Sequence, residues 1–176
     1  AYILAHCNVK VLVTSGQRLA LLAEVLAECP DLHTVVVVEE QPPALARNLR
    51  QTVLSYPAFT AIGSDAKPHR RIDTDMTAIL YTSGSTGKPK GCMHTHATVL
   101  HNVAGAAAWK HIGENVVALA TAPFFHVTGL VHSFLSAMYA GGTMVIQRRW
   151  DPLAAAKLVE QYRCTHWDNV PTMVVD

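Results

Sequence analysis

The sequence predicts an α/β fold in which a mainly parallel sheet is flanked by helices, and three observations lead to this prediction. Strand-like and helix-like runs alternate along the chain. Residues 34–39 include four consecutive valines, and a strand that is apolar on both faces fits a parallel sheet covered by helices. Hydrophobic residues make up 50% of the 176 residues and charged residues 15%, which is typical of a chain with a buried core and excludes a disordered one.

The first half of the chain is expected to form one βαβ unit followed by a less regular stretch. Apolar residues from Leu19 to Leu26 recur at helical spacing, and Pro30 ends that helix. The basic run at 67–71 is more typical of a solvated linker than of a localisation signal. The predicted elements are strands at 9–14 and 34–39 with the helix between them, a short helix near 44–54 and a linker at 55–75.

The second half repeats the alternation of strands and helices. Thr95 is predicted to cap a helix, and Asp151 followed by Pro152 is the preferred start of another. An apolar helix is expected to end at Gly141. The predicted elements are strands at 77–82, 116–120, 143–147 and 165–169, helices after Thr95, at 129–140 and after Asp151, and loops at 83–90 and 121–128.

Charge and cysteine patterns exclude several classes of protein. The chain has 14 Lys and Arg against 13 Asp and Glu, so bulk electrostatics do not favour binding to nucleic acid. Residues 115–146 have no charged side chain, but Pro123 and Gly141 interrupt the stretch, which favours buried core over a transmembrane segment. The four cysteines are far apart in sequence and are expected to lie in apolar surroundings, which favours reduced thiols in a cytoplasmic protein.

The low charge also bears on domain organisation. Soluble domains usually have about 25% charged residues, so 15% suggests a surface that more protein covers. The sequence begins and ends within patterned segments, and we expect 1–176 to be part of a larger domain with one core. Partners are then the remainder of its own enzyme and, as an open alternative, further copies of the same chain.

The most informative segment is residues 81–91, with the sequence Tyr-Thr-Ser-Gly-Ser-Thr-Gly-Lys-Pro-Lys-Gly. Glycines let backbone N–H groups approach an anion, while hydroxyls and lysines add donors and charge, so the loop predicts a polyphosphate site. Pro89 stands where a Walker A loop needs glycine, and the glycine spacing does not fit the dinucleotide fingerprint. A flexible connecting loop is the alternative.

This segment resembles the phosphate-loop signature of the adenylate-forming superfamily, and specifically AMP-forming acyl-CoA synthetases. The resemblance implies that the loop contacts the β- and γ-phosphates of ATP while a carboxylate attacks the α-phosphate. The implied nucleotide-binding residues are Thr82, Ser83, Gly84, Ser85, Thr86, Gly87, Lys88 and Lys90.

A second segment, residues 122–130, resembles the aromatic and histidine motif of the same family, which lies beside the acyl group and the CoA channel. The implied substrate-binding residues are Phe125, His126, Thr128 and Gly129. Without the family, His126 would more often be a hydrogen-bonded core residue than a functional one.

The resemblance implies part of the N-terminal domain of an ATP-dependent acyl-CoA ligase that uses ATP, Mg²⁺ and CoA. A fatty acid is the favoured substrate. An aryl-CoA ligase and a non-catalytic nucleotide-binding or scaffold module stay open as alternatives. The adenine, ribose and catalytic lysine motifs of the family have no match here, so residues 1–176 alone should contain no catalytic residue and be inactive. No metal site is expected, since His94 and His96 lack further ligands nearby.

Overall fold

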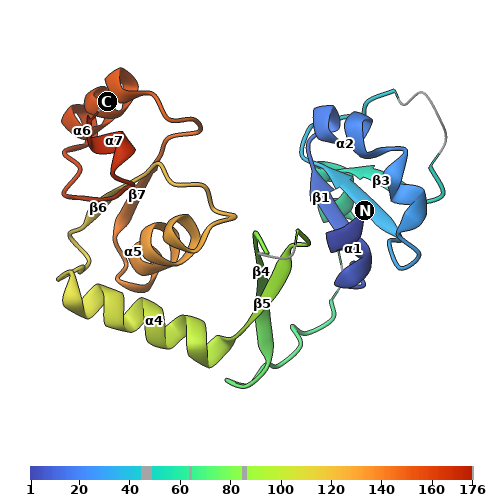
Figure 1. The fold of residues 1–176 in the computed structure, drawn as a ribbon, viewed down its shortest axis with the longest axis horizontal. Helices are drawn as coiled ribbons and strands as arrows, with labels where there is room; N and C mark the ends of the chain where they lie inside the picture. The colour runs from blue at the N-terminus through green and yellow to red at the C-terminus, as the bar shows by residue number, and fades with distance from the viewer. Residues whose placement is uncertain (45–48, 64, 85–86, 176) are drawn as a thin grey trace. The chain divides into compact units, whose positions relative to one another are not determined.

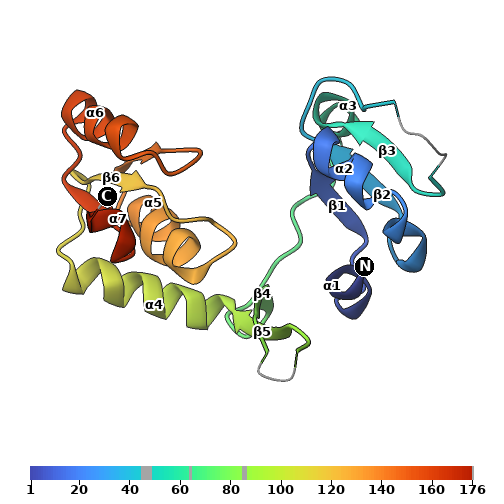
Figure 2. The same ribbon diagram turned by 45° about the horizontal axis from the view of Figure 1, so that its top comes forward.

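The computed structural model describes residues 1–44, 49–63, 65–84 and 87–175 (Figures 1 and 2). The chain divides into two compact units, residues 1–69 and 70–176, and each is described by itself. The sequence suggested a single core. The structure has instead a hydrophobic cluster in each unit.

The first unit contains a three-stranded sheet in the order β1-β2-β3, with both strand pairs parallel. Its elements are α1 (Tyr2–His6), β1 (Val11–Thr14), α2 (Gly16–Leu22), the 3-10 helix η1 (Val25–Glu28), β2 (Thr34–Val37), β3 (Thr52–Ser55) and α3 (Tyr56–Ala61). The predicted strands at 9–14 and 34–39 are confirmed, and the predicted helix between them is present as α2 and η1.

Packing on β2 explains why this unit forms. Val35 and Val37 are fully buried and pack with Leu19, Leu26 and Cys29 of the connecting segment. Val36 is fully buried as well, so β2 is covered on both faces, as its run of valines predicted.

One prediction for the first unit is wrong. The expected helix near 44–54 cannot reach residue 54, because residues 52–55 form β3 and pair in parallel with β2. Thr52 and Val53 are β-branched and fit a strand, and tertiary pairing decides the outcome. Ser55 then caps α3 by accepting a hydrogen bond from the Ala58 amide at 3.2 Å, which places a short helix inside the predicted linker. Residues 45–48 lie outside the described part.

The second unit contains an antiparallel hairpin and a three-stranded parallel sheet. Its elements are β4 (Met76–Thr82), β5 (Lys90–Thr95), α4 (His96–Trp109), β6 (Val117–Ala120), the π-helix η2 (Thr128–Leu135), α5 (Ser136–Tyr139), β7 (Thr143–Ile146), α6 (Pro152–Tyr162), β8 (His166–Asp168) and α7 (Thr172–Val175). The predicted caps Thr95 and Asp151 are confirmed, because each side chain accepts an amide hydrogen bond three residues later.

The strand order β7-β6-β8 determines where this sheet has a crevice. β6 lies in the centre, so the chain moves to one side of it to form β7 and to the other side to form β8. Leu119 and Val145 pack with Ala155 of α6 on one face. The η2–α5 helix lies on the other face (Figures 1 and 2). Loops that leave neighbouring parallel strands toward opposite faces leave a crevice at the strands' carboxyl ends, where ligands commonly bind.

Two features of the second unit differ from expectation. Residues 90–95, expected to lie outside any strand, form β5, which makes this part of the fold antiparallel. Their sequence contains a glycine and polar residues, so it lacks a strand signal. The apolar helix predicted at 129–140 begins as a π-helix. The Ser136 hydroxyl donates to the Val131 carbonyl at 2.9 Å, five residues earlier, a spacing that matches this wider helix.

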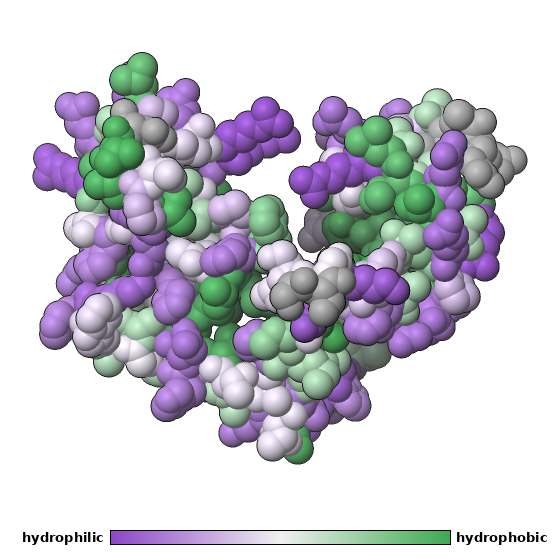
Figure 3. All heavy atoms as spheres, in the orientation of Figure 1, coloured by the Kyte–Doolittle hydropathy of each residue, from purple (hydrophilic) through white to green (hydrophobic). Residues whose placement is uncertain are grey.

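Apolar side chains remain exposed on both units. Figure 3 shows green, hydrophobic atoms on the visible face of each. Val13 and Leu21 are exposed in the first unit, and Met93 and Leu153 in the second. Within the described residues, no helix is both long and apolar enough to cross a membrane.

Candidate functional site

The glycine-rich loop connects the two strands of the β4–β5 hairpin. Thr82 and Lys90 are the last paired residues, and the Thr82 hydroxyl donates a long hydrogen bond of 3.5 Å to the Lys90 carbonyl. The Gly87 amide donates to the Gly84 carbonyl at 3.1 Å and closes a turn. The hairpin therefore fixes both ends of the loop.

Two glycines in this loop have distinct conformational roles. A Cβ on Gly84 would lie 2.1 Å from the Lys88 carbonyl oxygen, so no larger residue fits without moving backbone. Gly87 has a φ of +87° and no atom within 4 Å of its ideal Cβ, so its requirement is conformational rather than steric. Gly84 therefore sets the path of the loop, and Gly87 its turn.

The loop presents positive charge and hydroxyl groups to solvent. Lys88 and Lys90 are exposed, and within the described part of the chain neither forms an ion pair. Thr82 and Ser83 are exposed beside them. Of the predicted phosphate-binding residues, the structure thus brings six to one hairpin loop, while Ser85 and Thr86 lie outside the described residues. Exposed cations and backbone amides can bind phosphate groups.

The aromatic and histidine segment follows β6. The His126 amide donates to the Pro123 carbonyl at 3.0 Å, and the His126 carbonyl accepts from the Leu130 amide at 2.9 Å. The Thr128 amide donates to His126 Nδ1 at 3.2 Å. His126 is exposed, and Nε2 has no hydrogen-bond partner among the described residues. The backbone thus orients the imidazole and leaves one nitrogen for a ligand.

Gly129 allows the π-helix to begin against this segment. A Cβ there would lie 2.2 Å from the Pro123 carbonyl oxygen and 2.5 Å from that of Ala122. Both neighbours are backbone atoms, which cannot rotate away as a side chain can. Gly129 is buried, and its lack of a side chain lets η2 begin against the residues that follow β6.

A crevice lies at the carboxyl ends of β6 and β7, as the strand order requires. Its volume is about 400 Å³, and residues that follow each strand line it. Phe125, which follows β6, lines it and is 79% exposed. Arg148 and Arg149, which follow β7, line it as well, and neither forms an ion pair within the described residues. An aromatic ring beside two guanidinium groups suits a ligand with both apolar and anionic parts.

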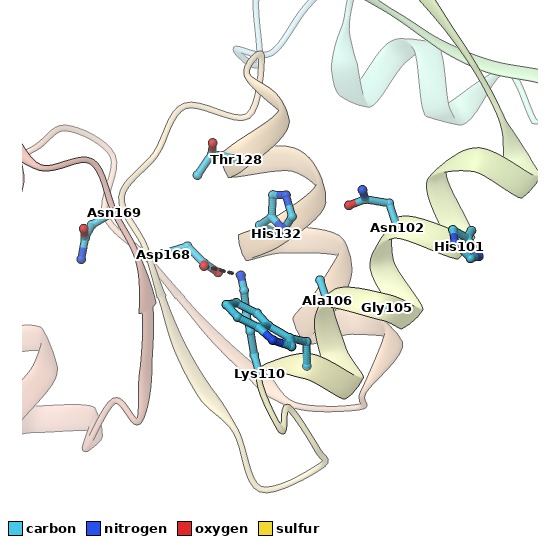
Figure 4. Close-up of a pocket in the computed structure, with 10 residues that line it drawn as sticks. His101, Asn102, Gly105, Ala106, Lys110, Thr128, His132, Asp168 and Asn169 are labelled. Carbon is cyan, nitrogen blue, oxygen red and sulfur yellow. Dashed lines mark hydrogen bonds and ion pairs between the residues drawn. The ribbon is translucent and has the colours of Figure 1, made fainter.

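A second cavity, of about 480 Å³, lies among α4, η2 and the end of β8. Thr128 and His132 reach it from η2, and Asn102 from α4 (Figure 4). Lys110 at the end of α4 forms an ion pair with Asp168 of β8, and these two side chains are 20% and 24% exposed. Thr128 belongs to the predicted motif, so the cavity and the crevice adjoin the same segment from different sides.

Apart from Thr128, the residues that line this cavity were absent from the predicted site. Among them, His132 lies one helical turn after Thr128, and Asp168 and Asn169 lie at the carboxyl end of a predicted strand. In the sequence, a helical position and a strand end are only weak indications of a binding site. Lys110 and Asp168 are 58 residues apart, and only the fold brings them together.

The described residues offer no metal site. No group of three or more His, Cys, Asp or Glu side chains in the described ranges is arranged to bind a metal ion. All four cysteines are free thiols, of which Cys29 is buried and Cys92 exposed. The exposure of Cys92 differs from the expectation that all four lie in apolar surroundings.

Comparisons with known proteins agree with this geometry. The AMP-binding enzyme family matches residues 1–176. A long-chain-fatty-acid–CoA ligase of Thermus thermophilus is 29% identical over 98% of this chain and 31% of its own length. A feruloyl-CoA synthase of Amycolatopsis is 38% identical over 56% of this chain and 20% of its own.

The fold also matches solved structures. ATP-bound MatB of Rhodopseudomonas palustris superposes with a TM-score of 0.74 at 23% identity, covering 99% of this chain and 32% of that one. The chain therefore spans about a third or less of the proteins that it matches here. The family match extends over the whole sequence, and the chain belongs to the AMP-binding enzyme family.

Proposed function

We propose that residues 1–176 are part of the N-terminal domain of an AMP-forming acid–CoA ligase, which activates a carboxylic acid with ATP and transfers it to CoA. The observation that carries this proposal is the β4–β5 loop, in which a Cβ on Gly84 would clash with the Lys88 carbonyl oxygen and Lys88 and Lys90 are exposed. Membership of the AMP-binding enzyme family and the CoA ligases among its relatives support it.

In the proposed reaction, a carboxylate oxygen attacks the α-phosphorus of ATP, and the bond to the β-phosphate oxygen breaks. The products are acyl-adenylate and pyrophosphate. The loop residues hold the β- and γ-phosphates, so they stabilise the charge that develops on the leaving group. The CoA thiolate then attacks the acyl carbon, and AMP leaves with the bonding electron pair.

The segment between β6 and η2 separates the acid from CoA in this proposal. Thr128 lines the cavity beside Asn102, which we assign to the acid. Phe125 lines the crevice beside Arg148 and Arg149, whose charge suits the phosphates of CoA. His126 lies between Phe125 and Thr128 in the sequence, and we assign it a contact with the acyl group or the incoming thiol.

The proposed function leaves two classes of acid as candidate substrates. The sequence favours a fatty acid, with an aromatic acid as the alternative. The relatives include ligases of both kinds, so they support an acid–CoA ligase without selecting its acid. A nucleotide-binding or scaffold module that keeps the phosphate loop without the reaction is the competing function, and acid-dependent exchange of pyrophosphate into ATP by the intact protein separates the two.

The intact protein must supply what this chain lacks. Mg²⁺ is implied by the reaction, but the described residues provide no cluster of ligands for it, so we assign this chain no step that uses a metal. Positive charge at the α-phosphate must come from elsewhere, and the chain alone is expected to be inactive. Four free thiols support a cytoplasmic location.

Substitution of His126 tests the assignment. In the intact protein, His126→Ala should lower acyl-CoA formation by about 10-fold or more, since it removes a polar contact at the reacting group. Acid-dependent exchange of pyrophosphate into ATP should fall less. His69→Ala, at an exposed position in the first unit, is the control. Unchanged acyl-CoA formation by a folded His126→Ala protein would contradict the assignment.

A further inference from the structure

The cavity among α4, η2 and β8 has a lining that is unusual for an alkyl chain. Seven of its ten lining residues are polar, charged or histidine: His101, Asn102, Lys110, Thr128, His132, Asp168 and Asn169. Burying an alkyl chain against such groups removes them from water without replacing their hydrogen bonds, which costs about 1–3 kcal/mol for each group left unpaired. The lining therefore favours a ligand that forms hydrogen bonds.

His132 is the clearest sign of an unfilled hydrogen-bonding requirement. Its Nδ1 is buried and has no partner, and no hydrogen bond to its Nε2 occurs among the described residues. Figure 4 shows the imidazole between Thr128 and Asn102, whose amide points toward it across the cavity. The ring thus lines the cavity with its hydrogen-bonding capacity unused.

The charges of the cavity argue against an anionic group on the distal part of the ligand. Lys110 is paired with Asp168, so its positive charge is already balanced. A second carboxylate on the ligand would lie near the Asp168 carboxylate and be repelled. A neutral hydroxyl avoids this repulsion, and it can both donate to and accept from imidazole and amide groups.

The apolar residues of the cavity indicate which kind of carbon skeleton the ligand has. Gly105 and Ala106 are small and lie one helical turn before Trp109 on α4, and together they give the cavity an apolar part beside the polar one. Aromatic rings pack well on such surfaces. A volume of about 480 Å³ is in the range of small-molecule sites.

From these observations we infer that the cavity binds the ring of a hydroxylated aromatic carboxylic acid, with His132 and Asn102 hydrogen-bonded to the ring hydroxyl. This inference rests on the proposed function and selects the acid that it activates. His132 acts as a specificity residue and has no part in the bond-making steps.

The test compares two acids that differ by one hydroxyl, 4-hydroxycinnamate and cinnamate, in acid-dependent pyrophosphate exchange by the intact protein. Dodecanoate is included as an alkyl acid. We expect kcat/KM for 4-hydroxycinnamate to exceed that for cinnamate by about 10- to 100-fold, as for the loss of one or two hydrogen bonds to the ligand. Dodecanoate should be a poorer substrate than 4-hydroxycinnamate.

Variants then locate the source of that preference. His132→Leu should reduce the ratio to within about 3-fold of unity, since it removes the hydrogen bond to the ring hydroxyl, which cinnamate does not form. His132→Gln, which restores a donor and an acceptor, should recover part of the ratio. Asn102→Leu, at an exposed position of α4, should also lower the ratio, and it tests the inference if His132→Leu does not fold. His69→Leu is the matched control and should leave the ratio unchanged.

The possible results separate this inference from the proposed function. Exchange with dodecanoate or cinnamate at least as efficient as with 4-hydroxycinnamate overturns the inference and leaves the ligase intact. An unchanged ratio in both folded variants overturns the roles of His132 and Asn102. If no acid supports exchange, the proposed function fails. Direct binding, followed by Trp109 fluorescence with Trp109→Phe as its control, then decides whether the cavity still prefers the hydroxylated acid by the same factor.

Discussion

Replacement of Gly129 by alanine tests how the π-helix is held beside the aromatic and histidine segment. The added Cβ would lie 2.2 Å from the Pro123 carbonyl oxygen, and contacts under 3.0 Å are essentially never observed for a real Cβ. Relief needs movement of either the start of η2 or the loop after β6, because both partners are backbone. Thr128 and His126 move with it.

The cost of this change can be estimated from two opposing effects. Overpacking of a rigid contact costs about 3 kcal/mol, the upper end of the usual range, because no side chain can rotate away. Alanine reduces the entropy of the unfolded chain and returns about 0.4–1 kcal/mol. The net loss in the free energy of unfolding should be about 2 kcal/mol. A displacement near 1 Å at the site should also lower pyrophosphate exchange by about 10²-fold.

Urea unfolding and the exchange assay measure these two effects in the intact protein. Gly113→Ala is the matched control, since no atom lies within 4 Å of its ideal Cβ, and both quantities should stay near wild-type values. A Gly129→Ala protein with the stability and the exchange rate of Gly113→Ala would refute the reasoning. It would mean that the contact between η2 and residues 122–123 does not position the site.

Two further predictions concern titratable groups away from the site. Burial raises the pKa of the Cys164 thiol, so at pH 8 iodoacetamide should modify the exposed Cys92 well before Cys164, and mass spectrometry that found the opposite order would contradict the described packing. Hydrogen bonds from Lys10 and Asn8 lower the pKa of Asp31. A carboxylate with a lowered pKa stabilises the fold above its unfolded pKa of about 3.9, and this contribution is lost as pH falls through the folded value. Asp31→Asn should therefore lower the urea midpoint at pH 7 and approach wild type below pH 3, whereas an equal difference at both pH values would argue against the interaction.

The sequence predicted those elements whose signals are local. The valine run of β2, the threonine cap of α4 and the Asp151–Pro152 start of α6 each depend on a few adjacent residues, and each is confirmed. β3 was missed although Thr52 and Val53 favour a strand, because its pairing with β2 decides the outcome for so short a segment. β5 was missed because its pairing with β4, rather than its own side chains, makes it a strand. A sequence without strand propensity still pairs when a hairpin or a neighbouring strand satisfies its backbone.

The same distinction between local and long-range signals applies to the candidate site. The phosphate loop and the aromatic and histidine segment could be proposed from the sequence because each is contiguous in it. The cavity lined by His132, Lys110 and Asp168 was not, because its walls come from three separate elements. Its strand-end aspartate was visible in the sequence, but the lysine that neutralises it lies on a helix whose direction only the fold fixes.

The most direct test of the proposed ligase is ATP–pyrophosphate exchange by the intact protein, with and without a carboxylic acid, in wild type and in Gly84→Ala. A Cβ at this position would lie 2.1 Å from the Lys88 carbonyl oxygen and must shift the phosphate loop. We predict exchange that depends on the acid and that falls by about 10²-fold in Gly84→Ala, while Gly113→Ala retains it. Exchange of equal rate in folded Gly84→Ala protein, or no exchange with any acid, would contradict the assignment of this loop to the phosphates of ATP.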